Sequence, residues 1–65
     1  MKEYSRTEIS EAIDEWILNQ KHRDILKRRL IDGVTFDDLA EEFLMSTRQI
    51  KRIVYKTQET LFRHI

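Results

Sequence analysis

The sequence of 65 residues contains no cysteine, so neither a disulfide framework nor a cysteine-based zinc site can stabilise the fold. It also lacks any apolar run near the roughly 20 residues that a helix needs to cross a bilayer, and its polar N-terminus is unlike a signal peptide. A chain this short forms one domain that buries only about 60% of its unfolded surface. We therefore expect a single cytoplasmic domain with no membrane partner, stabilised by packing or self-association.

The sequence carries no net charge, because 12 basic residues balance 12 acidic ones. No overall positive field therefore attracts the protein to nucleic acid. The charges are nevertheless unevenly distributed: residues 1–20 carry −3 (two basic, five acidic), 21–31 carry +4 (five and one), 32–42 carry −5 (none and five), and 43–65 carry +4 (five and one). Positive charge is concentrated in two separate segments.

Apolar residues recur at helical spacing in the first half of the chain and predict two helices. The first, over about residues 7–18, follows a Ser-x-x-Glu capping box and carries an apolar stripe in which we expect Trp16 to be a core residue. The second runs over about residues 21–32 and ends at Gly33, since a glycine just past a periodic segment is the usual left-handed C-terminal cap.

The pattern of a helix-turn-helix begins at Thr35. Thr35 and Ser46 are favourable N-caps and predict a helix over about residues 36–43 and a recognition helix over about 47–63. Ala40 stands where two crossing helices must approach closely, and apolar residues at helical spacing supply their inner faces. Together with the first two helices, this predicts an all-α fold, a compact four-helix domain that contains a helix-turn-helix.

The segment RDILKRRLIDGVTFDDLAEEFLMSTRQIKRI combines several features in order. It has an Ile-Leu pair with a basic run, an Asp-Gly-x-Thr corner, a Leu-Ala-Glu-Glu core helix, and a Ser/Ile/Ile frame around the recognition helix. These features resemble region 4, the promoter-reading domain of bacterial sigma factors, and its relatives in phages and mobile elements, over residues 23 to about 63. One position departs from the family. The left-handed turn residue is usually glycine, asparagine or aspartate, and this sequence has Leu44.

The resemblance implies a small sequence-specific DNA-binding transcriptional regulator from a phage or mobile element, with double-stranded DNA as its partner. In that family the positions that face promoter DNA are matched here by Thr47, Arg48, Gln49, Lys51 and Arg52. Arginine offers a bidentate fork to guanine, and glutamine offers one to adenine. The residues placed to anchor DNA phosphates are Thr35, Ser46, Tyr55 and Lys56. Lys27 and Arg28 on the second helix could reach a flanking part of the DNA backbone.

A second class of function stays open, a protein-binding module that inhibits or recruits a partner such as RNA polymerase or a host nucleic-acid enzyme. The zero net charge and the acidic faces of the first and third helices favour it, because acidic surfaces repel DNA. An enzyme is not expected, since no nucleophile–base pair can be assembled. No metal or other cofactor is expected either, because His22 and His64 lack partners at ligand spacing.

Self-association is a further expectation, because small helix-turn-helix proteins commonly bind DNA as symmetric dimers. Phe62 falls on the same outer arc of the last helix as Tyr55, beyond the part that fits in a groove, with Ile65 nearby. It is either a contact between two copies or part of a frayed C-terminus.

Overall fold

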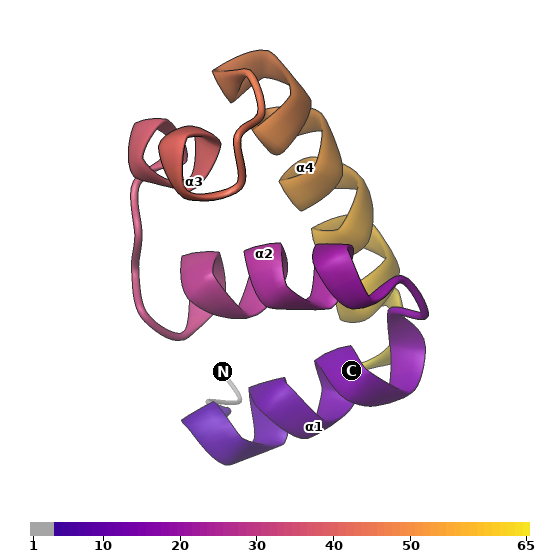
Figure 1. Cartoon of the computed structure of the whole chain (residues 1–65). Helices are drawn as coiled ribbons and strands as arrows, with labels where there is room; N and C mark the ends of the chain where they lie inside the picture. Colours follow the sequence, from indigo (N-terminus) through magenta and orange to yellow (C-terminus); the bar gives the residue numbers. More distant parts are fainter. Residues whose placement is uncertain (1–3) are drawn as a thin grey trace.

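The computed structural model describes residues 4–65, so the first three residues of the polar N-terminus discussed above lie outside it. Over residues 4–65 the fold is all-helical and compact, with four helices and no strand (Figure 1). The helices are α1 (Arg6–Trp16), α2 (Gln20–Leu30), α3 (Phe36–Glu42) and α4 (Thr47–His64). Each begins within one residue of its predicted start, while α1 and α2 end two residues earlier than predicted.

Side-chain caps fix where the helices begin. Ser5 and Glu8 form the predicted capping box before α1, and Ser46 and Gln49 form another before α4. Thr35 caps α3, its hydroxyl accepting from the backbone N–H of Asp38 at 3.2 Å. The starts follow from the sequence because each cap joins residues only three positions apart.

The core is apolar and shared by all four helices, and α2 and α4 each contact the other three. Its buried members are Ala12, Ile13, Ile17, Ile25, Leu26, Leu39, Ile50, Val54 and Leu61. The prediction that Trp16 belongs to this core is wrong. Trp16 is 39% exposed and stacks on His64, with ring centroids 3.8 Å apart. Trp16 lies in the last turn of α1, and its neighbour at the end of α4 is the flat imidazole of His64. The indole therefore stacks on this ring and does not enter the core.

Four residues, Phe43 to Ser46, connect α3 to α4. Leu44 has a φ of 55°, so it adopts the left-handed conformation that the turn position requires. The backbone N–H of Met45 donates to the carbonyl of Ala40 at 2.9 Å, and that of Leu44 donates to the carbonyl of Glu41 at 3.4 Å. These two bonds form a Schellman motif, which ends α3 at a defined angle. The side chain of Leu44 is 92% exposed.

Gly33 adopts the predicted left-handed conformation, with a φ of 69°, although α2 already ends at Leu30. The chain then folds back, because the backbone N–H of Val34 donates to the carbonyl of Arg28 at 3.1 Å and Val34 packs against the core. Among residues 4–65, no helix is long and apolar enough to cross a membrane.

Candidate nucleic-acid interface

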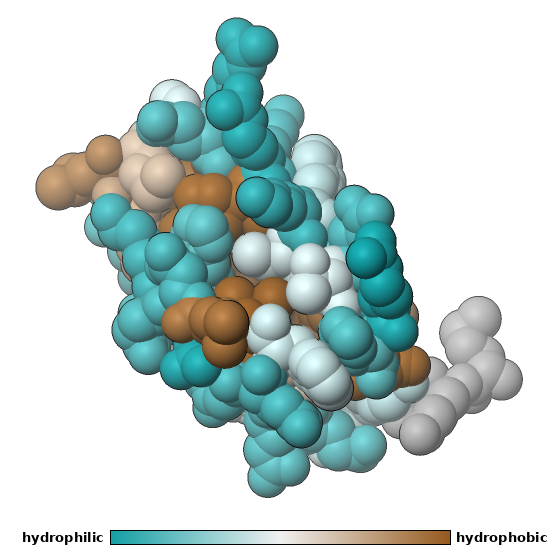
Figure 2. All heavy atoms as spheres, turned by 90° about the vertical axis from the view of Figure 1, so that its right-hand side faces the viewer, coloured by the Kyte–Doolittle hydropathy of each residue, from teal (hydrophilic) through white to brown (hydrophobic). Residues whose placement is uncertain are grey.

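The outward face of α4 carries five of the eleven predicted DNA-binding residues. At 100° per residue they span an arc of about 140° opposite the buried stripe. The exposed members of this surface, called here the basic arc, are Arg48, Lys51, Arg52, Tyr55 and Lys56. Within residues 4–65, Arg48, Arg52 and Lys56 form no ion pair. The side of the molecule on which α4 lies in Figure 1 is largely hydrophilic, with separate hydrophobic patches (Figure 2).

Phe36, the first residue of α3, supports one edge of the basic arc. Its ring and that of Tyr55 pack edge to face with centroids 5.9 Å apart, and Nζ of Lys51 lies 5.8 Å from the centroid of the Phe36 ring. The guanidinium of Arg29 covers the same ring at 4.2 Å and donates to the carbonyl of Val34 at 3.0 Å. The cluster therefore joins α2, α3 and α4. Phe36 and Arg29 could not be assigned to this surface from the sequence, because the contacts are between helices. Tyr55 is 19 residues from Phe36, and Phe36 is 7 residues from Arg29.

Several residues at the start of α4 that were predicted to contact DNA form hydrogen bonds within the protein. The hydroxyl of Thr47 donates to the carboxylate of Asp37 at 3.2 Å, which ties α4 to α3. The side-chain oxygen of Gln49 accepts from the backbone N–H of Ser46 at 3.1 Å and from its hydroxyl at 3.2 Å. Thr47, Gln49 and Ser46 thus fix the position of α4.

The two basic residues predicted on α2 both pair with acids. Nζ of Lys27 lies 2.7 Å from a carboxylate oxygen of Asp14, and Arg28 pairs with Glu42 at 3.2 Å and with Asp32 at 3.0 Å. Hydrogen bonds from Arg28 to Glu42, and then to Asp32, raise the pKa of its guanidinium above the ordinary value. These charges are compensated inside the protein, in contrast to the unpaired cations of the basic arc.

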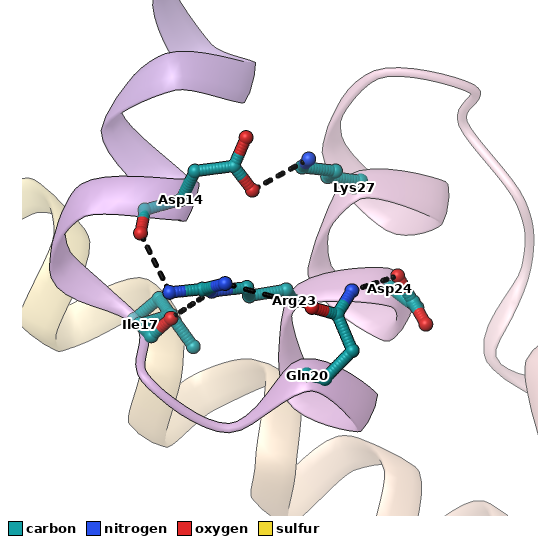
Figure 3. Close-up of polar contacts among 6 residues, drawn as sticks. All are labelled: Asp14, Ile17, Gln20, Arg23, Asp24 and Lys27. Carbon is teal, nitrogen blue, oxygen red and sulfur yellow. Dashed lines mark hydrogen bonds and ion pairs between the residues drawn. The ribbon is translucent and has the colours of Figure 1, made fainter.

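A polar network that the sequence did not reveal closes the corner between α1 and α2 (Figure 3). Arg23 donates through Nε to the carbonyl of Ile17 and through Nη2 to the carbonyl of Asp14 at 2.8 Å. Gln20 accepts from Arg23 at 3.5 Å and donates to Asp24 at 3.0 Å. The last turn of α1 has no basic residue of its own, so Arg23 supplies the cation that favours a helix C-terminus.

A second surface of opposite charge lies along α1. Glu8, Glu11 and Glu15 fall within about 60° of one another around the helix and, within residues 4–65, form no ion pair. They line an open hollow together with Tyr4, Ala12, Trp16, His64 and Ile65. In the part of the chain that the structure describes, no group of three or more His, Cys, Asp or Glu residues could hold a metal ion.

Comparison with known proteins found no matching family model, no similar curated protein and no similar solved structure.

Proposed function

We propose that the protein is a sequence-specific DNA-binding transcriptional regulator resembling sigma region 4, in which α3, the turn at Leu44 and α4 form a helix-turn-helix. The observation that carries the proposal is the basic arc, whose cations Arg48, Arg52 and Lys56 are exposed and have no acidic partner within residues 4–65. Unpaired cations on one helix face suit a phosphate-lined groove, because neutralising each phosphate releases bound counterions.

The arrangement of α3 and α4 supports this docking. In helix-turn-helix proteins the second helix lies in the major groove with its N-terminal residues on base edges, and the first helix crosses the DNA backbone. Arg48 and Arg52 occupy the first two turns of α4, whereas the buried Val54 and Leu61 face the core. Phe36 contacts both Lys51 and Tyr55, and these two side chains would bind phosphates of the DNA backbone. Lys56, one turn beyond Arg52, would bind another phosphate.

The test is a fluorescence-polarisation titration of the protein against a random-sequence duplex and a selected duplex at several salt concentrations. Lys56→Ala should weaken both duplexes alike and flatten the slope of log K against log salt by about 0.9, the effect of one lost phosphate contact. Lys27→Ala should leave the slope nearly unchanged, because Lys27 is paired with Asp14. A parent protein whose binding to every duplex is absent or independent of salt would refute DNA binding.

Arg52→Ala distinguishes a base-specific contact from non-specific attraction to the DNA backbone. It should cost about 1–3 kcal/mol on the selected duplex and little on random DNA, because a base contact is lost. Arg63→Ala is the matched control: it removes the same side chain 11 residues along α4, where Arg63 pairs with Glu59 at 3.1 Å. Equal losses for the two variants would show that Arg52 reads no base.

The second candidate function, a protein-binding module, is favoured by the acidic surface of α1. Its three carboxylates stand beside Trp16, which is 39% exposed, and α3 is acidic in its first turn. Such a surface suits a basic segment of a protein. Core RNA polymerase titrated into the labelled protein tests it. A complex that is lost in Glu11→Gln with Glu15→Gln, for a protein that binds no duplex, would favour this function over DNA binding.

A further inference from the structure

The side-chain amide of Gln49 has both acceptor sites of its oxygen in use. Oε1 accepts from the backbone N–H of Ser46 at 3.1 Å and from the Ser46 hydroxyl at 3.2 Å. An amide oxygen has two lone pairs, so this cap leaves none for another donor. Bidentate recognition of adenine needs that oxygen to accept from N6 while the amide nitrogen donates to N7. Gln49 can therefore read adenine in this way only by giving up its part in the cap of α4.

Two other polar side chains at the start of α4 also have partners. The hydroxyl of Thr47 donates to Asp37, and the ammonium group of Lys51 lies over the ring of Phe36. The side chains of Arg48 and Arg52 are exposed and, within residues 4–65, have no hydrogen-bond or ion-pair partner. The resemblance implies that five positions on α4 face DNA. Of these, only Arg48 and Arg52 have side chains without a partner among residues 4–65.

Arg48 and Arg52 are one helical turn apart. Four residues separate them by about 6 Å along α4 and by about 40° around it, so both point to the same side. Base pairs rise by about 3.4 Å, so the two side chains reach bases about two steps apart. The guanidinium fork matches O6 and N7 of guanine in the major groove.

We infer that the protein selects duplexes with two guanines about two base-pair steps apart, one read by Arg48 and the other by Arg52, and that Gln49 positions α4 without reading a base. The inference rests on the proposed DNA-binding function and adds the chemistry of the preferred site. Gln49 is a positioning residue, because it acts through the backbone of Ser46 at the start of the recognition helix.

The test is selection from a randomised duplex library, read by sequencing, with the parent, Arg48→Ala, Arg52→Ala and Gln49→Ala. The parent should enrich two guanines at fixed spacing. Each arginine variant should lose preference for one of them, by about 5- to 150-fold, the range for one bidentate pair. Gln49→Ala should keep both preferences and weaken all sequences alike. Circular dichroism sets a temperature at which every variant is folded, and Arg63→Ala is the control that should match the parent.

The outcomes separate the inference from the proposed function. A parent that binds no duplex overturns both. A parent that binds and enriches an adenine whose preference disappears in Gln49→Ala overturns the inference alone, because Gln49 then reads a base. Enriched guanines that persist in both arginine variants also overturn it, while DNA binding stands.

Discussion

Leu44→Gly tests whether the turn between α3 and α4 stores strain. Leu44 is the one non-glycine residue among residues 4–65 with a positive φ, at 55°. In that conformation the Cβ of an L-residue crowds the following carbonyl, which costs roughly 1–2 kcal/mol. Glycine has no Cβ, so the substitution removes that cost and leaves the Schellman bonds of the backbone in place.

Two opposing contributions reduce the gain. Glycine loses more backbone entropy on folding, by about 0.5–1 kcal/mol. The leucine side chain is 92% exposed, so its removal forfeits only about 0.2 kcal/mol of the roughly 1.5–3 kcal/mol that full burial of a leucine contributes. The balance is a stabilisation of about 0.5 kcal/mol.

Urea denaturation followed by circular dichroism measures the change, and a thermal melt should move upward by about 2–4 °C. Leu44→Ala is the matched control, since it removes nearly the same side chain but keeps a Cβ at positive φ. It should be neutral or slightly destabilising. A loss of more than about 1 kcal/mol in Leu44→Gly would refute the reasoning, because Leu44 would then have to be packed in an ordinary conformation.

Three further outcomes are expected. Ala40→Leu should overpack the approach of α3 to its neighbours and cost about 1–3 kcal/mol in a urea titration, whereas Glu41→Ala, which is exposed, should change stability by less than about 0.5 kcal/mol. Arg23→Ala should cost about 2 kcal/mol in the same assay by releasing two carbonyls at the α1–α2 corner, and Lys21→Ala, exposed on the same helix, should not. Phe62, 48% exposed on α4, should contact a second copy, so sedimentation at high micromolar concentration should show a dimer for the parent and a monomer for Phe62→Ser, and a monomeric parent would rule the contact out.

The features that the sequence predicted correctly depend on residues close together in the chain. The capping residues Ser5, Thr35 and Ser46 each act three positions away, and Gly33 adopts the left-handed conformation predicted for it. Helix starts were therefore predicted to within one residue. The basic arc of α4 was also predictable, because a helix face depends only on spacing along one element.

The features that the sequence missed depend on contacts between elements. The spacing of Trp16 on an apolar stripe could not show that its neighbour in space is His64, 48 residues later, which leaves the indole partly exposed. The helical pattern of α1 continued to residue 18, yet Ile17 is extended, and Arg23 from the next helix takes its carbonyl. This hydrogen bond joins two helices, so local propensity could not predict it.

The distribution of charge along the chain could not distinguish α2 from α4, since each of their segments carries five basic residues and one acidic residue. Asp32, just after α2, pairs with Arg28, and two further acids that compensate α2 come from other helices. Asp14 on α1 reaches Lys27, and Glu42 on α3 reaches Arg28 from 14 residues away. Among the described residues, 4–65, no such acid pairs with Arg48, Arg52 or Lys56 on α4.

Net neutrality does not by itself oppose DNA binding in this molecule. At physiological ionic strength, exposed charges are screened beyond about 8 Å. The longest dimension is 32 Å, and α1 with its unpaired carboxylates lies at the opposite end from the start of α4 (Figure 1). A duplex at the basic arc would therefore experience the local cations and the acids of α3, and hardly those of α1. Of the α3 acids, Asp37 is held at the edge of the arc by the hydroxyl of Thr47.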